Sequence, residues 1–192
     1  MKKENSQFSG YMLIAVFVIP LLIAIAMYSL RDHLPSMSSV SHGALIHPAE
    51  PIKALTIVTK QNKTMSLEEI KGKWTYIVYA PNGCDLECEA SLFKLRQTKT
   101  ATGRETNRIQ SVLLLQNGVL NSAVALRNPK TIVGRLKKLE VEAQPGVNKA
   151  LIPGSIYLLD PHANMMMQYD GHATSKGMLK DIKKLLKISN IG

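Results

Sequence analysis

The sequence predicts an α/β fold: a central sheet of mixed strand direction with flanking helices, preceded by one transmembrane helix. Three observations lead to this prediction. A long apolar run without charge lies near the N-terminus, β-rich and helical segments alternate over residues 51–192, and two cysteines follow the most hydrophobic strand of that region. A chain of 192 residues has room for one ordinary domain and a short appendage.

The N-terminal segment Tyr11–Leu30 contains no charged side chain. A helix of this length spans roughly 30 Å, since each residue rises about 1.5 Å, and this matches the hydrocarbon thickness of a bilayer. Lys2 and Lys3 precede the segment, so the positive-inside rule places residues 1–10 in the cytoplasm and the rest of the chain on the far side. A cleaved signal peptide with its cleavage site near Ala24–Ala26 is the alternative, and it also exports the domain.

Residues 31–50 are rich in serine, histidine and proline and show no periodicity. We expect them to form a linker between the membrane and the domain of residues 51–192. The linker contains His33, His42 and His47, which we interpret as solvated side chains rather than metal ligands.

The first half of the domain alternates between strand and helix signals. Residues 54–59 are a β-rich run, and the helical turn that follows is capped by Ser66 with Glu69 in a capping box. Residues 74–80 are aromatic or β-branched and apolar on both faces, which predicts a central strand. Residues 84–97 predict a helix. Its rough apolar stripe consists of Leu86, Ala90, Phe93 and Leu95.

The second half continues this alternation. Residues 109–115 predict a second buried strand, and residues 129–139 predict a helix with a proline near its first turn. Residues 155–159 and 165–169 are two strands separated by turn residues, which predicts a hairpin. The C-terminal segment 175–188 has apolar residues at helical spacing with lysines opposite, as in an amphipathic helix.

The chain is basic, with 24 Lys and Arg against 14 Asp and Glu and a formal net charge of +10. A basic surface suits nucleic acid, anionic lipid or an acidic protein. The sequence contains no zinc-finger spacing, no RNA-binding aromatic pattern and no dense run of basic residues. We therefore expect no nucleic-acid partner and interpret the charge as that of a soluble domain beside lipid headgroups.

The two cysteines, Cys84 and Cys88, are spaced C-x-x-x-C where the predicted central strand gives way to a helix. A helix N-terminus stabilises a thiolate. Side chains four residues apart on a regular helix have Cβ atoms about 5–6 Å apart, whereas a disulfide needs about 3.5–4.5 Å. Cys84 is therefore expected on the preceding loop or at the cap. The acidic residues Asp85, Glu87 and Glu89 oppose thiolate formation and favour a bound cation.

Three hypotheses fit this cysteine pair: a structural disulfide, a redox pair that exchanges with another protein, or a Cu(I) site, since soft thiolates suit Cu(I). A copper site wants a third ligand. The local candidates are His172 and the run Met165–Met167, and alternate methionines of a strand are more often core residues than ligands.

Several short motifs together resemble the Sco (synthesis of cytochrome c oxidase) family. They are Gly72–Trp74, the strand that follows, the Cys84-x-x-x-Cys88 pair and Tyr157–Pro161. A subgroup of Sco-related membrane proteins encoded beside bacterial cytochrome oxidase genes is also similar at Leu95–Gln97, Gly103–Arg104 and Gly177–Asp181.

The resemblance implies a thioredoxin-like domain tethered to the bacterial inner membrane, with the N-terminus cytoplasmic and the domain periplasmic. It implies a role in cytochrome c oxidase assembly by thiol–disulfide exchange, Cu(I) handling or both. The implied partners are an oxidase subunit or its assembly factors. A thiol–disulfide oxidoreductase would use Cys84 to attack and Cys88 to resolve the mixed disulfide, and a copper protein would use both as ligands.

The sequence departs from the Sco pattern in two places. Glu89 follows Cys88 where the family carries a Cys-Pro pattern, and the stretch Ala150–Ser155 lacks the family's copper-binding histidine. Cys84 and Cys88 thus carry over while the third ligand does not, which leaves thiol chemistry or a copper site completed by His172 or by a partner. Pro153 resembles the proline that faces the cysteines in thioredoxin folds, and the sequence leaves its cis or trans state open.

A competing hypothesis is a non-catalytic interaction module tethered to the membrane. In that case the disulfide only stabilises the domain, and the basic surface docks on an oxidase subunit. Serine at Cys84 separates the two hypotheses, because the module would still bind its partner.

Overall fold

The computed structural model describes residues 6–29, 41–59, 61–118, 121–141 and 151–191. Its contacts divide the chain into two compact units, Met1–Val40 and Ser41–Gly192, and each is described by itself.

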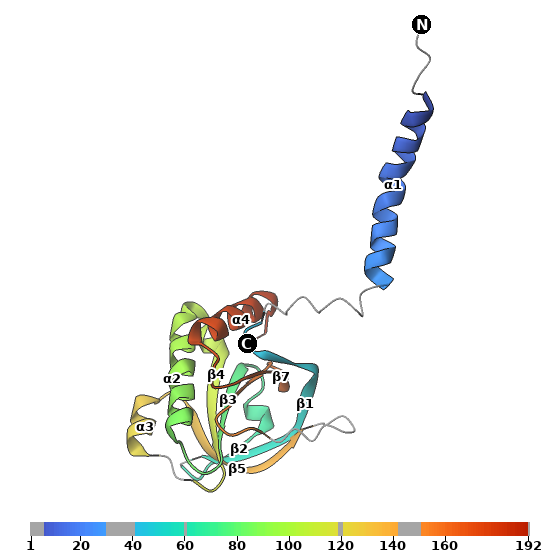
Figure 1. The fold of residues 1–192 in the computed structure, drawn as a ribbon. Coiled ribbons are helices and arrows are strands. Elements are labelled where there is room, and N and C mark those ends of the chain that lie inside the picture. Colours follow the sequence, from blue (N-terminus) through green and yellow to red (C-terminus); the bar gives the residue numbers. More distant parts are fainter. Residues whose placement is uncertain (1–5, 30–40, 60, 119–120, 142–150, 192) are drawn as a thin grey trace. The chain divides into compact units, whose positions relative to one another are not determined.

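The N-terminal unit contains helix α1 (Ser6–Ser29), drawn in blue in Figure 1, with Pro20 inside it. The helix overlaps the segment 11–30 that the sequence predicts to be helical. Among the residues that the structure describes, no helix combines the length and the hydropathy needed to cross a membrane. The helix is therefore confirmed, and the membrane span is not.

The C-terminal unit is built on one mixed sheet. Within the described residues its strand order is β2-β1-β5-β4-β3-β6-β7, and β1 also pairs with β7. The central strands β5, β4 and β3 run parallel, and the remaining pairs are antiparallel. The strands are β1 (Ala44–Thr59), β2 (Thr64–Ser66), β3 (Trp74–Ala80), β4 (Ile109–Leu115), β5 (Ile132–Val141), β6 (Ile156–Leu159) and β7 (Asn164–Tyr169). The predicted α/β fold with a central mixed sheet is confirmed.

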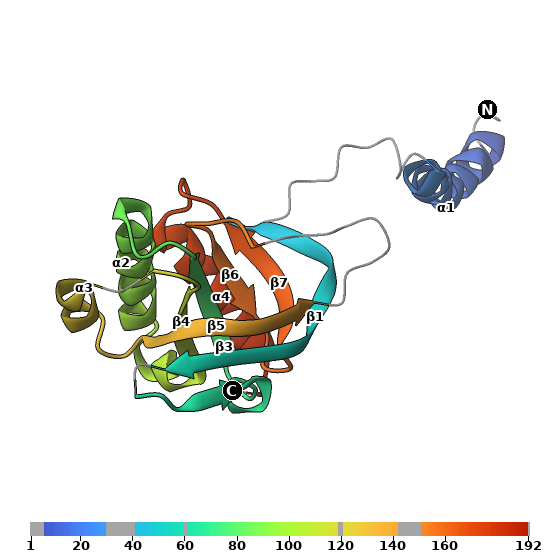
Figure 2. The same ribbon diagram turned by 90° about the horizontal axis from the view of Figure 1, so that it is seen from below.

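The long strand β1 bends so that its first part pairs with β7 and its second part with β5 (Figure 2). Helices α2 and α4 pack against each other on the sheet. The helical elements of the unit are η1 (Leu67–Glu69), α2 (Leu86–Ala101), η2 (Gly103–Arg108), α3 (Ser122–Arg127) and α4 (Ser175–Ile188), where η marks a 3-10 helix.

Strand β3 contributes to hydrophobic cores on both faces of the sheet. Trp74, Tyr76 and Val78 join the cluster that includes buried residues of α2 and α4. Ile77 points to the opposite face and joins a cluster with residues of β1, among them Ile57. This alternation follows from the two-residue period of a strand, and it confirms that 74–80 is a central strand buried on both faces.

Two local predictions are confirmed. The backbone N–H of Ser66 donates to the Glu69 carboxylate at 2.8 Å, as the capping box requires. Strands β6 and β7 form the predicted antiparallel hairpin. Its turn is held by the Asp160 carboxylate, which accepts backbone N–H groups of His162 at 2.9 Å and Asn164 at 2.8 Å.

The predicted linker, residues 31–50, is partly wrong, because residues 44–50 form the first part of β1. Leu45 pairs with Met167 of β7, and this pairing across the sheet overrides the proline-rich composition of the segment. His47 is exposed on this strand, and His33 lies outside the described residues.

The third linker histidine, His42, is not simply solvated. The backbone N–H groups of His42 and Gly43 donate to the Asp181 carboxylate of α4 at 2.8 and 3.2 Å. The imidazole Nδ1 of His42 lies 3.1 Å from the same carboxylate, and the Tyr169 hydroxyl donates to it at 3.3 Å. Asp181 is buried on α4. Its hydrogen bonds to His42 and Gly43 attach the start of the domain to this last helix.

The helix predicted over residues 129–139 is wrong, because residues 132–141 form strand β5. This strand lies between β4, which it meets in parallel at Val112, and β1, which it meets antiparallel at Leu55. Two neighbouring strands supply hydrogen-bond partners on both sides, and this tertiary environment overrides the helical pattern of the sequence. A short helix not predicted from the sequence, α3, precedes the strand.

The helix predicted over 84–97 is present, but of the four residues of its predicted apolar stripe only Leu95 is buried, while Leu86, Ala90 and Phe93 are exposed. Leu86 is 86% exposed and Phe93 is 49% exposed. The buried face of α2 consists of Cys88, Ser91, Leu92, Leu95 and Thr98. The error arises because two buried positions carry hydroxyls. Each hydroxyl has a backbone acceptor, the carbonyl of Gly154 for Ser91 at 3.0 Å and that of Lys94 for Thr98 at 2.8 Å.

Candidate thiol and copper site

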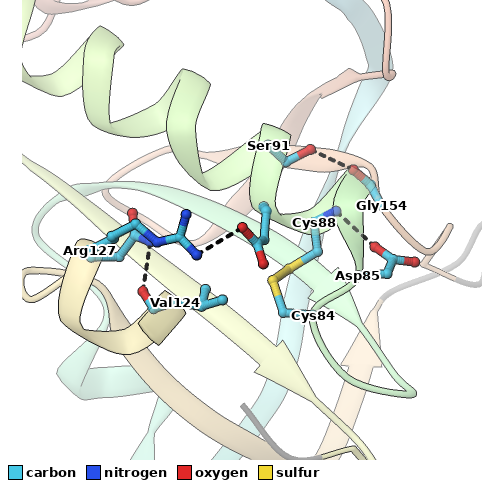
Figure 3. The surroundings of a disulfide bond; sticks show 9 residues. Cys84, Asp85, Cys88, Ser91, Val124, Arg127 and Gly154 are labelled. Carbon is cyan, nitrogen blue, oxygen red and sulfur yellow. Dashed lines mark hydrogen bonds and ion pairs between the residues drawn. A yellow bond between two sulfur atoms is a disulfide. The ribbon is translucent and has the colours of Figure 1, made fainter. Parts of the chain in front are cut away.

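Cys84 and Cys88 form a disulfide with a Cα–Cα distance of 5.1 Å (Figure 3). Cys84 lies two residues before α2 and is partly exposed, as the spacing argument predicts. Cys88 lies in the first turn of α2 and is 0% exposed. The two sulfurs are therefore unequal, because only that of Cys84 belongs to a residue that solvent or a partner can reach.

Asp85, between the cysteines, is the N-cap of α2. Its carboxylate accepts the backbone N–H of Cys88 at 2.9 Å. Such a cap typically stabilises a helix by about 1 kcal/mol. The capping interaction fixes the backbone of Cys88 and explains why an acidic residue is placed beside a thiol.

The loop that carries Cys84 packs against the loop after β4, backbone on backbone. The carbonyl of Pro81 accepts N–H groups from Gln116 at 3.2 Å, Asn117 at 2.8 Å and Gly118 at 3.1 Å. A Cβ at Gly118 would lie 2.0 Å from the backbone nitrogen of Gly83, and Gly83 has φ of +113°. Both glycines are needed for this close approach.

The loop before β6 faces the start of α2. The Ser91 hydroxyl donates to the carbonyl of Gly154 at 3.0 Å, and a Cβ built at Gly154 would lie 3.0 Å from the Glu87 carboxylate. Gly154 N–H donates to the carbonyl of Tyr79 at 2.9 Å, which ties the loop to β3. In this loop the bond before Pro153 is trans, since the cis bond found among the described residues is His47–Pro48.

The acidic residues around the pair do not form a cation site. Glu89 makes an ion pair with Arg127 of α3, with 3.2 Å between Oε2 and the guanidinium nitrogen (Figure 3). Asp85 is used as a cap, and Glu87 lies over the loop at Gly154. Within the part of the chain that the structure describes, no group of three or more His, Cys, Asp or Glu side chains is arranged to hold a metal ion.

His172, the candidate third copper ligand, lies on the turn between β7 and α4 and is exposed. Its backbone N–H donates to the Asp170 carboxylate at 2.9 Å. The structure does not bring its side chain together with the cysteines in a metal-binding group. Met165 and Met167 are buried in the two cores, which agrees with the expectation that they are core residues.

Sequence reasoning missed Gly118 and Arg127, which position the cysteine loop and neutralise Glu89. No pattern in the sequence near either residue indicates that it lies beside the cysteines. Gly118 comes 34 positions after Cys84 and Arg127 lies on a helix that the pattern did not predict. Only the parallel pairing of β3 with β4 brings these segments to the same end of the sheet.

Solved structures with a similar fold include Bradyrhizobium japonicum ScoI with copper bound, at 15% identity and a TM-score of 0.51, covering 70% of this chain and 98% of that one. Apo Sco1 from Thermus thermophilus is 11% identical with a TM-score of 0.57, covering 79% and 99%. BsSco, described with a disulfide switch and as a member of the Sco family of cytochrome c oxidase assembly proteins, is 13% identical with a TM-score of 0.53, covering 74% and 96%. These likenesses show a shared fold.

No curated protein matches the sequence. Residues 74–189 match the family described as "Transmembrane-like, thioredoxin-like, C-terminal domain". The match covers more than half of the chain and includes β3, both cysteines and α4. The chain therefore belongs to this family of thioredoxin-like domains.

Proposed function

We propose that this protein is an assembly factor for cytochrome c oxidase that acts through Cys84 and Cys88, by thiol–disulfide exchange and as a carrier of Cu(I). The observation that carries the proposal is the disulfide at the start of α2, with Cys84 partly exposed and Cys88 buried. The similar structures support it, since one is described with copper bound and another with a disulfide switch in a family of oxidase assembly proteins.

In the exchange step a thiolate of a partner protein attacks the sulfur of Cys84, because Cys88 is shielded. The bond between the two cysteines breaks, a mixed disulfide forms, and the Cys88 sulfur leaves as a thiolate and takes up a proton. The position of Cys88 in the first turn of α2 favours this leaving thiolate. A second partner thiol then displaces Cys84. The partner loses two electrons and two protons and gains a disulfide, and both cysteines become thiols.

Cu(I) is proposed as a cargo of the reduced pair. Two thiolates are the soft donors that Cu(I) prefers, so Cys84 and Cys88 fit this ion. A further ligand would come from the partner protein or from His172, whose exposed turn keeps it accessible.

The location is part of the proposal. The uncharged segment Tyr11–Leu30 would anchor the chain in a bacterial inner membrane, with residues 1–10 in the cytoplasm and the domain in the periplasm. Export to that compartment would permit the disulfide. Proteolysis of intact spheroplasts tests the orientation: the domain is expected to be digested, and full protection of the domain would contradict it.

The decisive experiment compares Cys84→Ser with Cys88→Ser in a strain that lacks the gene. Both variants lose the same disulfide, but Cys88→Ser also places a hydroxyl at a buried position, so thermal melting of each variant verifies that it is folded. Thiol–disulfide exchange is reversible, so the Cys84 thiolate of Cys88→Ser can attack the disulfide of an oxidised oxidase subunit or assembly factor and release one partner cysteine as a thiolate. Without Cys88 to resolve it, this mixed disulfide is expected to accumulate. Non-reducing electrophoresis should show at least about tenfold more of this adduct than for Cys84→Ser. Oxidase activity is expected to fall in both strains.

An anaerobic titration of the reduced full chain with Cu(I) against a competing chelator tests the copper arm. Binding of one ion that both serine variants weaken supports the carrier role, and weaker binding by His172→Ala would identify the third ligand. If neither variant forms an adduct, copper does not bind, and oxidase assembly continues, the protein is an interaction module with a structural disulfide.

A further inference from the structure

A cavity lies beside α2, beyond Arg96 as seen from the disulfide end of the helix. Its volume is about 260 Å³, and it lies between the C-terminal part of α2, η2, β4 and the connection from α3 to β5. Both figures show α2 and α3 side by side, with β5 leaving from the end of α3 (Figures 1 and 2). The lining residues are Arg96, Lys99, Thr100, Thr106, Ser111, Asn128, Pro129, Lys130 and Thr131. Neither cysteine lines it.

The charge of this cavity is entirely positive, because its lining contains Arg96, Lys99 and Lys130 and no acidic residue. Some basic side chains elsewhere on the surface have acidic neighbours, such as Lys71 with Glu68. Among the residues that the structure describes, the ammonium groups of Lys99 and Lys130 make no hydrogen bond and no ion pair. The cavity thus gathers cationic donors that the protein itself does not neutralise.

Burial and the neighbouring charges of Lys130 and Lys73 lower the pKa of Lys99. All of these influences disfavour its charged form. An anion held among these lysines would reverse the effect, since an opposite charge within a few ångströms favours the ammonium ion.

The remaining polar groups of the cavity are positioned by the fold. The hydroxyls of Ser111 and Thr131 lie 3.2 Å apart, so one donates to the other and the second hydrogen is available to a ligand. Arg96 is held in place by a hydrogen bond of 2.6 Å to the carbonyl of Arg127 and by its position 5.4 Å over the Phe93 ring. Its guanidinium has five N–H donors, so others are left for a ligand.

We infer that this cavity binds a phosphate group. Its lining brings together two unpaired lysines, a guanidinium held in place by its neighbours and a pair of hydroxyls. Phosphate offers several acceptor oxygens and up to two negative charges, which matches the cationic side chains and hydroxyls that line this cavity from different elements. The phosphate could belong to a small soluble molecule or to a phospholipid headgroup, and the experiment below distinguishes these sources. The inference stands on residues outside the disulfide and does not depend on the proposed function.

The test uses the purified full chain and three single substitutions: Lys99→Gln, Lys130→Gln and Lys183→Gln. Lys183 is exposed on α4 and does not line the cavity, so its substitution removes the same charge elsewhere. Inorganic phosphate is titrated calorimetrically at constant ionic strength. The wild type and Lys183→Gln are expected to bind alike, and the two cavity variants about tenfold or more weakly, since each loses a charge-assisted hydrogen bond. Thermal melting without phosphate verifies that each variant is folded.

Vesicles of phosphatidylcholine with and without phosphatidic acid form the second arm. If Lys99→Gln weakens binding to the acidic vesicles more than Lys183→Gln does, the phosphate comes from lipid. If the two variants bind the vesicles equally well while Lys99→Gln binds free phosphate more weakly than Lys183→Gln does, the ligand is a soluble phosphate compound. The inference is overturned if neither probe saturates, with phosphate tested to about 10 mM, or if all three variants lose affinity equally, because binding would then reflect net charge alone.

Discussion

At the scale of single residues, the cysteine site depends on side chains that are small or absent. Gly83 adopts a positive φ just before Cys84, and Gly118 lets the loop after β4 approach it backbone to backbone. Asp85 then caps α2 through the N–H of Cys88. The reactive residues are thus placed by three neighbours that take no part in the chemistry.

A methyl group at position 118 tests this argument. Gly118→Ala puts a Cβ 2.0 Å from the nitrogen of Gly83, so the Cys84 loop must move. We expect a loss of unfolding free energy of about 1–3 kcal/mol, as for overpacked sites, and a changed reduction potential of the disulfide. Urea denaturation and equilibration with glutathione measure the two quantities.

Gly171→Ala is the matched control, because a Cβ there has nothing within 4 Å and the substitution keeps the Gly171 carbonyl that accepts from Lys94 of α2. It should change neither quantity appreciably. A Gly118→Ala protein as stable as the control, with the same reduction potential, would show that the loop adapts to the methyl group.

At the scale of elements, the contact between α4 and the start of β1 determines where the domain begins. Asp181 is buried on α4 and accepts the two backbone N–H groups of His42 and Gly43. The chain at His42 and Gly43 has few apolar side chains to bury, so these hydrogen bonds, rather than hydrophobic packing, attach it to α4.

Asp181→Ala should cost at least about 3 kcal/mol of unfolding free energy, because it leaves two backbone donors and the Tyr169 hydroxyl without their acceptor. His42→Ala removes only a half-exposed imidazole and keeps both backbone bonds, so it should cost less than about 1 kcal/mol. Urea denaturation of both variants checks this ranking. Equal costs would mean that the imidazole, rather than the backbone donors, makes the contact.

At the scale of the whole molecule, the core on the helix side encloses two tyrosines. The rings of Tyr76 and Tyr169 lie 6.3 Å apart, and both residues are almost fully buried. Burial raises the pKa of Tyr76, with a further contribution from Asp181. Burial also raises the pKa of Tyr169, with contributions from Tyr76 and Asp181. The folded protein therefore keeps both phenolic protons well above the pH at which an exposed tyrosine loses them.

This difference predicts alkaline destabilisation. Below about pH 10 both folded and unfolded chains hold these protons, so the stability does not depend on them. Above it the unfolded chain releases both while the folded chain holds them, and the unfolding free energy falls by about 1.4 kcal/mol per pH unit for each tyrosine. Urea denaturation at a series of pH values measures the slope. Tyr76→Phe should lower it by about 1.4 kcal/mol per pH unit, and an unchanged slope would contradict the assignment.

The sequence by itself determined the elements whose signals are local. The central strand 74–80, the hairpin of β6 and β7, the capping box at Ser66 and the terminal helix all follow from side-chain period and turn chemistry. It also identified Cys84 and Cys88 and placed Cys84 before the helix, because disulfide geometry excludes a regular helical spacing. These features depend on residues close together in the chain.

Only the tertiary structure decided the features that depend on residues far apart in the sequence. Residues 132–141 are a strand because β4 and β1 lie on both sides, and residues 44–50 join the sheet because β7 is present to pair with them. The same holds at the site, where Gly118 and Arg127 meet the cysteine loop through the parallel pairing of β3 and β4. Hydrogen-bond partners and close approaches between remote segments leave no periodic signal in a sequence, because they arise only when the sheet assembles.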